Sequence, residues 1–123
     1  MSLVKICGLT RPEDIEAANE AGPTYIGFVF APSRRRVTPE TAARLRAGLR
    51  ADIRVVGVFV DAPPGEPEAL LQRGIIDIVQ LHGRETEEDI RALKERTGAP
   101  VIKAVRMETP GDAARWRDSA ADW

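Results

Sequence analysis

Short apolar runs alternate with segments of helical spacing five times along this chain, and no change in composition interrupts the series. The runs are rich in Val, Ile and Phe and are nearly continuously apolar, as expected of parallel strands that are covered on both faces. The expected strands are residues 3–7, 25–30, 55–60, 76–81 and 101–105. Strand and helix alternation of this kind predicts an α/β fold with a parallel sheet.

Polar residues mark the expected starts of the helices between these strands. A threonine oxygen before a helix can accept hydrogen bonds from the free N–H groups of the first turn, and four threonines stand at such places: Thr10, Thr38, Thr86 and Thr109. The first of them is expected to form a capping box within residues 10–13. Three glycines are placed to end helices: Gly22, Gly74 and Gly98. A short third helix is expected around residues 68–73.

Length and charge limit the number of domains and the kinds of partner. A chain of 123 residues has room for one domain or part of one. Its formal net charge of -1 gives no basic excess for nucleic acid or for an anionic membrane. The single cysteine excludes an intrachain disulfide framework, and the start lacks the apolar core of a signal peptide or a membrane span. We therefore expect a soluble, reduced, cytoplasmic protein.

The one cysteine, Cys7, lies at the end of the first expected strand, just before Gly8. A thiolate is both a base and a nucleophile, and catalytic side chains of barrel enzymes gather where parallel strands end. A lone cysteine is more often a small buried hydrophobe, and its position alone does not exclude that role. Alternation along the strand places Lys5 on the same side as Cys7, where it could supply positive charge near the thiol.

Periodicity leaves two architectures open. A repeated βα unit can form an open doubly wound sheet or close into an eight-stranded barrel. The chain has no G-x-G-x-x-G after its first strand, which argues against a dinucleotide-binding fold.

Six segments in order resemble the motifs of phosphoribosylanthranilate isomerases, (β/α)8-barrel enzymes of tryptophan biosynthesis. They are K-I-C-G-L-T at 5–10, G-F-V-F at 27–30, residues 33–40, G-V-F-V at 57–60, V-Q-L-H-G at 79–83 and I-K-A-V at 102–105. The first and fifth segments are fairly specific in combination, and together the six span essentially the whole chain. The resemblance implies that residues 1–123 form a single, incomplete domain, the first five βα units of a (β/α)8 TIM barrel.

The resemblance also implies a reaction, an Amadori rearrangement of N-(5-phosphoribosyl)anthranilate that needs no cofactor or metal. In it a general acid protonates the ribose ring oxygen, and a general base removes the proton from the second sugar carbon. The family's cysteine base falls on Cys7. The family's arginine for the anthranilate moiety falls on Arg35, with Arg36 one position away as the alternative. The aspartate that serves as general acid is expected beyond Trp123.

Two further side chains at the end of the fourth strand are expected to contact substrate. Gln80 could hydrogen-bond the substrate or satisfy a polar group inside the barrel. His82, the only histidine, is expected to position substrate or pack a loop rather than to carry a proton. Asp61 follows the third strand, and we assign it no catalytic role because loop carboxylates are commonly caps.

Two hypotheses about function follow, because five βα units cannot close an eight-stranded barrel and would leave two strand edges open. In the first, residues 1–123 represent part of an isomerase that binds a small phosphosugar-anthranilate substrate and is a monomer or homodimer. In the second, they form a non-catalytic half-barrel that acts as an assembly or binding module. Under either hypothesis we expect the 123-residue chain alone to be inactive and to self-associate.

Overall fold

The computed structural model describes residues 5–63 and 65–103, in which strands and helices alternate strictly. In chain order the elements are β1 (Lys5–Cys7), α1 (Pro12–Ala21), β2 (Tyr25–Val29), α2 (Pro39–Ala47), β3 (Arg54–Phe59), α3 (Gly65–Gln72), β4 (Ile78–Leu81), α4 (Glu87–Thr97) and β5 (Val101–Lys103). All five expected strands are present. The third helix begins earlier than expected, and the helix expected after Thr109 lies outside the described residues.

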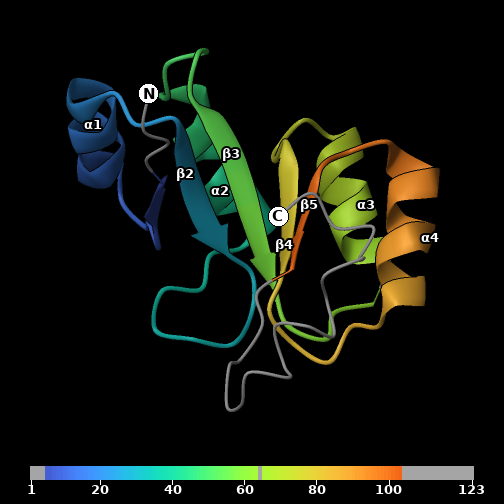
Figure 1. Ribbon diagram of the computed structural model, residues 1–123. Coiled ribbons are helices and arrows are strands. Elements are labelled where there is room, and N and C mark those ends of the chain that lie inside the picture. Colours follow the sequence, from blue (N-terminus) through green and yellow to red (C-terminus); the bar gives the residue numbers. More distant parts are fainter. Residues whose placement is uncertain (1–4, 64, 104–123) are drawn as a thin grey trace, which may run out of the picture.

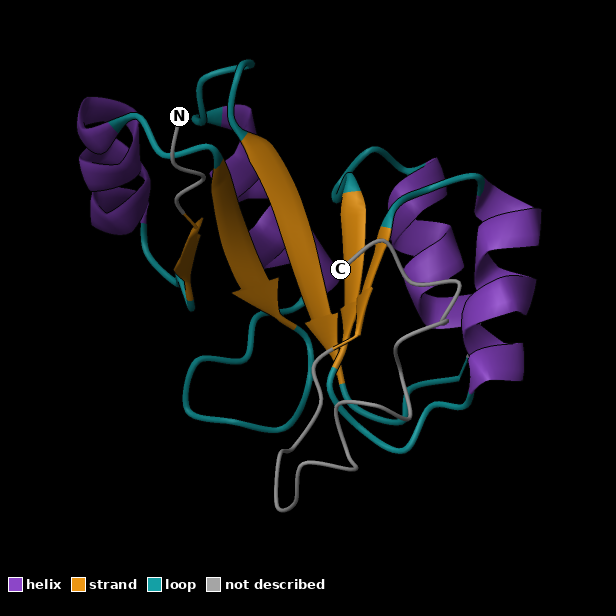
Figure 2. Cartoon of the chain, viewed as in Figure 1, coloured by secondary structure: helices purple, strands orange, loops and turns teal. Residues whose placement is uncertain are grey.

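The strands form one parallel sheet in the order β1-β2-β3-β4-β5. Their arrowheads all point to the same edge, and the helices lie around the outside of the sheet (Figures 1 and 2). A doubly wound sheet reverses its strand order at a switch point, whereas a barrel adds each strand beside the preceding one. The sequential order therefore confirms the α/β class and selects the barrel arrangement that periodicity left open.

The core lies between the sheet and the helices. On the outer face of the sheet, strands β2 to β5 carry fully buried residues, namely Ile26, Phe28, Val55, Val79 and Val101. The helices cover these residues with their own buried side chains: Ile15, Ala18, Ala42, Leu45, Leu70, Ile90 and Leu93. None of the helices within 5–63 and 65–103 has the length and apolar character needed to span a bilayer.

Two of the predicted helix caps are confirmed. The Thr38 hydroxyl accepts a hydrogen bond from the Thr41 N–H (3.2 Å) at the start of α2. At the start of α4, the Thr86 hydroxyl accepts from the Asp89 N–H (3.2 Å) and the Asp89 carboxylate accepts from the Thr86 N–H (2.8 Å). This reciprocal pair is a capping box, and it fixes where the loop after β4 ends.

The predicted capping box at Thr10 is wrong, because the N-cap of α1 is Arg11. The Asp14 carboxylate accepts hydrogen bonds from the backbone N–H groups of Thr10 and Arg11, each at 3.1 Å. Asp14 stands three residues after Arg11, which is the spacing a back-reaching acidic residue needs. The bond from Thr10 is the main cause that holds the pKa of Asp14 below its ordinary value of 3.8.

The three predicted helix-ending glycines all adopt positive φ values, which are 65° at Gly22, 71° at Gly74 and 69° at Gly98. The N–H of Gly22 donates to the Ala18 carbonyl (2.9 Å), and that of Gly98 donates to the Lys94 carbonyl (2.8 Å). These left-handed residues turn the chain back toward the sheet.

Candidate active site

Cys7 is the last residue of β1, and its thiol is exposed. Within the described residues, this cysteine is thus not a buried hydrophobe. Cys7 pairs in register with Gly27 of β2, and its Sγ lies over that glycine on the face of the sheet opposite the helices. The sulfur thus stands at the edge of the sheet where the parallel strands end, which is the edge that carries the active sites of barrel enzymes.

Arg35 lies close to Gly8, the residue after this cysteine. Its side chain crosses Gly8, so that a Cβ added to Gly8 would lie 2.5 Å from Arg35 Cδ and 2.9 Å from its Nη1. Gly8 has a φ of 84°, so its backbone conformation favours glycine. The structure therefore brings the predicted arginine over the residue that follows the predicted base.

The loop after β2 holds Arg35 in this place through local hydrogen bonds. The Arg35 N–H donates to the Ser33 hydroxyl (3.0 Å), and the Val37 N–H donates back to the Val29 carbonyl (2.9 Å). Arg36, the alternative arginine, forms a parallel bridge with Val29 and lines a separate cavity of about 270 Å³. Of the two arginines, only Arg35 is shown to cross Gly8, so the geometry favours Arg35 over Arg36 as the arginine of the candidate site.

Lys5 and Gln80 meet on the same face of the sheet as Cys7. The Lys5 Nζ donates a hydrogen bond to the Gln80 Oε1, although β1 and β4 are separated by two other strands. Adjacent strands lie about 4.8 Å apart, so the backbones of β1 and β4 would be roughly 14 Å apart in a flat sheet. The contact indicates that the sheet curves toward this face. Gln80 thus satisfies a polar group inside the curve, one of the two roles predicted for it.

His82 is the first residue after β4. Its backbone N–H donates to the Phe59 carbonyl at the end of β3 (2.9 Å), and its residue surface is exposed. It therefore stands at the same edge of the sheet as Cys7, as predicted for a residue of the strand ends.

A buried ion pair at this edge was not predicted from the sequence. The Lys103 Nζ lies 3.1 Å from the Glu85 Oε1, and the two side chains are 5% and 8% exposed. The Lys103 ammonium also donates to the Gly83 carbonyl (2.8 Å), while Glu85 accepts from the N–H groups of Gly83 and Asp61, each at 2.8 Å. These bonds tie the loops after β3 and β4 to the end of β5. The sequence did contain one signal for this pair, which is Lys103 within an otherwise apolar strand, since a buried lysine needs a partner of opposite charge.

Asp61 belongs to the same set of contacts. Its carboxylate accepts from the Arg84 N–H (2.5 Å), and a Cβ added to Gly83 would lie 2.5 Å from Asp61 Oδ1. The prediction that Asp61 acts as a loop cap is confirmed.

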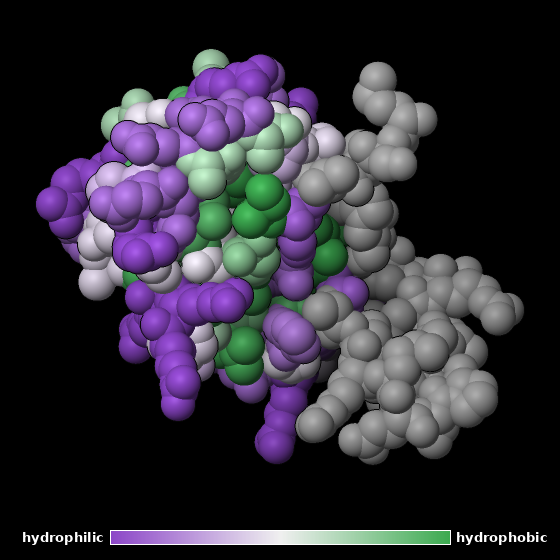
Figure 3. Space-filling model, turned by 90° about the vertical axis from the view of Figure 1, so that its left-hand side faces the viewer, coloured by the Kyte–Doolittle hydropathy of each residue, from purple (hydrophilic) through white to green (hydrophobic). Residues whose placement is uncertain are grey.

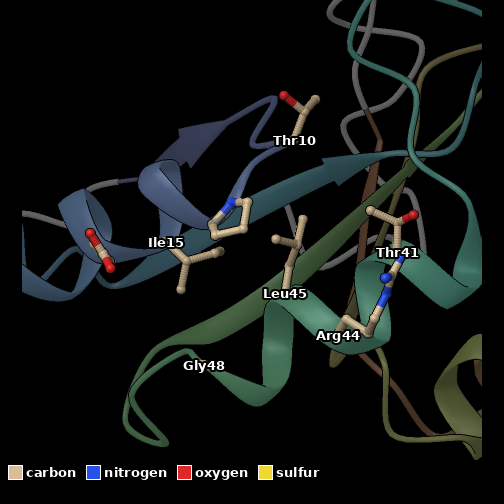
Figure 4. A pocket seen from close by; sticks show the side chains of 8 residues that line it. Thr10, Ile15, Thr41, Arg44, Leu45 and Gly48 are labelled. Atoms are coloured by element: carbon tan, nitrogen blue, oxygen red, sulfur yellow. The ribbon is translucent and has the colours of Figure 1, made fainter.

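The largest of the described cavities, about 440 Å³, lies elsewhere, in a groove between α1 and α2 (Figure 4). Ile15 and Leu45 form its apolar floor, and Glu16 and Arg44 line it too. Neither Cys7 nor Arg35 lines it. Its residues carry no arrangement that fits acid or base chemistry, so the strand ends remain the candidate site.

A parallel sheet of sequential order, with a thiol and a guanidinium at the strand ends, defines a protein of the (β/α)8-barrel class. Residues 4–120 match the family described as N-(5'phosphoribosyl)anthranilate (PRA) isomerase, and the chain belongs to that family.

Individual relatives agree with this assignment. An N-(5'-phosphoribosyl)anthranilate isomerase of Symbiobacterium thermophilum is 50% identical over 115 residues, which make up 94% of this chain and 50% of the relative. The crystal structure of a phosphoribosyl anthranilate isomerase from Thermus thermophilus matches with a TM-score of 0.87 and 41% identity, covering 98% of this chain and 59% of that one. A further isomerase structure contains reduced 1-(o-carboxyphenylamino)-1-deoxyribulose 5-phosphate and matches with a TM-score of 0.86 and 40% identity, over 94% of this chain and 59% of that one. The chain spans about half the length of the curated relatives it matches.

Proposed function

We propose that the protein containing this chain isomerises N-(5'-phosphoribosyl)anthranilate to 1-(2-carboxyphenylamino)-1-deoxyribulose 5-phosphate in tryptophan biosynthesis. The observation that carries the proposal is the exposed Cys7 thiol at the end of β1, with Arg35 lying across the next residue. Membership of the isomerase family supports it, as does the related structure that holds a reduced form of the product.

Cys7 is the proposed general base. Protonation of the ribose ring oxygen opens the ring to an iminium ion, which makes the hydrogen on the second sugar carbon acidic. The Cys7 thiolate takes this proton, the C–H electron pair forms the double bond between the first two sugar carbons, and the iminium electrons return to nitrogen. The resulting enolamine then tautomerises to the ketone.

Arg35 is the proposed partner of the anthranilate carboxylate. A guanidinium can form two parallel hydrogen bonds to a carboxylate and can stack on an aromatic ring. Gln80 and His82, at the ends of the same sheet, are proposed to contact the sugar portion of the substrate. The general acid is proposed to be an aspartate beyond Trp123, as the resemblance to the family implies.

A half-barrel that serves as an assembly or binding module is the second candidate. The described part of the chain pairs β1 only with β2 and β5 only with β4, so two strand edges carry no further strand. Apolar residues also gather in a strip on the face seen from the α1 side (Figure 3). Both features favour association of residues 1–123 with further strands or with a second copy.

Cellular setting and assembly follow from the same proposal. We place the protein in the cytoplasm, with a small-molecule substrate and no nucleic acid or membrane partner, as a monomer or a homodimer. A related isomerase from Thermotoga maritima is described as dimeric, which supports the second state. The two proton transfers use side chains alone, so the proposal includes no cofactor or metal.

Kinetics of the intact gene product test the proposal. Cys7→Ala should lower kcat by about 100- to 10,000-fold, which is what a general base commonly contributes. Turnover within about tenfold of the parent would remove Cys7 from the mechanism. Size-exclusion chromatography of residues 1–123 separates the candidates: a discrete, stable and inactive oligomer supports the module, whereas an insoluble or molten product supports a fragment of the isomerase.

A further inference from the structure

We propose that Gly27 is a positioning residue for the Cys7 thiol, because the absence of a side chain at Gly27 leaves the space in which Sγ lies. Gly27 is in the middle of β2 and is the register partner of Cys7. The inference rests on the proposed role of Cys7 as the general base.

The space between the two residues is too small for a second side chain. A Cβ added to Gly27 would lie 2.7 Å from the Cys7 Sγ and 3.4 Å from both the Cα and the Cβ of Cys7. Non-bonded heavy atoms pack best at about 3.5–4.0 Å. An alanine at Gly27 would therefore overlap the sulfur while only touching the rest of Cys7.

Backbone conformation does not require glycine here. Gly27 is within a regular strand and is not among the glycines with positive φ. An alanine could thus adopt the same backbone, and its methyl group would be the only disturbance. The substitution Gly27→Ala tests the space beside the thiol and nothing else.

The thiol is the part of this contact that is free to move. The Gly27 carbonyl accepts hydrogen bonds from the N–H groups of Gly8 (3.0 Å) and Leu9 (3.4 Å), which hold the end of β1 against β2. Moving β1 away would weaken these bonds, whereas the exposed thiol can rotate about its Cα–Cβ bond. An alanine at Gly27 would consequently turn the sulfur away from its present direction.

Gly57 provides a matched control on the neighbouring strand β3. A Cβ added to it would lie 2.9 Å from Ile76 Cδ1 and 3.0 Å from Phe59 Cε2, in the buried core on the helix side of the sheet. Gly57→Ala should lower Tm through overpacking and leave the thiol where it is. The two substitutions add the same methyl group to adjacent strands, but on opposite faces.

The experiment compares Gly27→Ala, Gly57→Ala and the parent in the intact gene product, with Cys7→Ser as the blank for labelling of Cys7. Rates of alkylation by iodoacetamide are measured against pH, and kcat and KM are measured with N-(5'-phosphoribosyl)anthranilate. Gly27→Ala should lower kcat by about 10- to 100-fold with an unchanged KM, since a displacement of about 1 Å can have an effect of this size. The dependence of its alkylation rate on pH should differ from that of the parent. Gly57→Ala should match the parent both in its kinetic constants and in its alkylation rates.

A Gly27→Ala variant with the parent's kcat and alkylation profile would overturn the inference. Should the variant be too unstable to assay, the Tm of Cys7→Ala/Gly27→Ala is compared with that of Cys7→Ala. Because the sulfur is absent from both, Gly27→Ala should lower Tm much less in this background than in the parent. An undiminished loss in that background would also overturn it. Failure of the proposed function is distinguishable, because it would show as full turnover in Cys7→Ala while the alkylation profile of Gly27→Ala still changed.

Discussion

Removing one partner of the ion pair between Glu85 and Lys103 should strongly destabilise the protein, because both side chains are almost completely buried, at 8% and 5% exposed. Glu85→Gln leaves the Lys103 ammonium buried without its counter-charge, and breaking a buried pair in this way costs about 3–5 kcal/mol. The Glu85 carboxylate also accepts from the N–H groups of Asp61 and Gly83, so the loops after β3 and β4 should loosen together.

Urea unfolding of the intact gene product measures this loss, with the free energy obtained by linear extrapolation. Asp52→Asn is the control, because its partner Arg50 and Asp52 itself are 49% and 64% exposed, and an exposed pair contributes about 1 kcal/mol or less. Combining Glu85→Gln with Lys103→Met should restore part of the stability, since no unpaired charge is then buried. A Glu85→Gln variant as stable as Asp52→Asn would refute the reasoning.

Three other substitutions test separate parts of the structure. Arg35→Ala should lower kcat/KM about 10- to 100-fold, since hydrogen bonds to a charged group contribute about 1.5–3 kcal/mol, and the exposed Arg34→Ala serves as the control in steady-state assays. Gly8→Ala should destabilise the protein in thermal unfolding by about 1–2 kcal/mol, because a residue with a side chain is strained at a φ of 84°; an unchanged Tm would contradict this. Because hydrogen bonding, chiefly from the Thr10 N–H, lowers the pKa of Asp14 in the folded state, ionised Asp14 stabilises α1 above pH 3.8 and this stabilisation is lost as pH falls through the lowered pKa. Tm of Asp14→Asn should therefore fall below the parent's at neutral pH and approach it in acid, and a pH-independent difference would count against this linkage.

The sequence pattern predicted the strands well because strands that are buried on both faces are continuously apolar. It could not predict the order of the strands within the sheet, since that depends on which strand pairs with which. The parallel order β1-β2-β3-β4-β5 settled this point. The cap of α1 was misplaced by one residue because the N-cap is Arg11, and it is Asp14 that reaches back to the N–H groups of Thr10 and Arg11, which the threonine pattern does not reveal.

The candidate site was predicted as separate residues rather than as an arrangement. Strand alternation correctly placed Lys5 on the same face of the sheet as Cys7, but the partner of Lys5 is Gln80, which is 75 residues away along the chain. The contacts of Arg35 with Gly8 and of the Cys7 thiol with Gly27 likewise join residues that are far apart along the chain. They form only when the sheet brings distant segments together. Spacing along a sequence carries no information about such contacts.

A crystal structure of the intact protein with reduced 1-(o-carboxyphenylamino)-1-deoxyribulose 5-phosphate would test the central claim most directly. The account predicts that the Cys7 Sγ lies about 3–3.5 Å from the second sugar carbon, the separation of groups poised to react, and that Arg35 pairs with the carboxylate. A ligand whose second sugar carbon lay beyond reach of the sulfur, with another side chain poised beside it, would contradict the account.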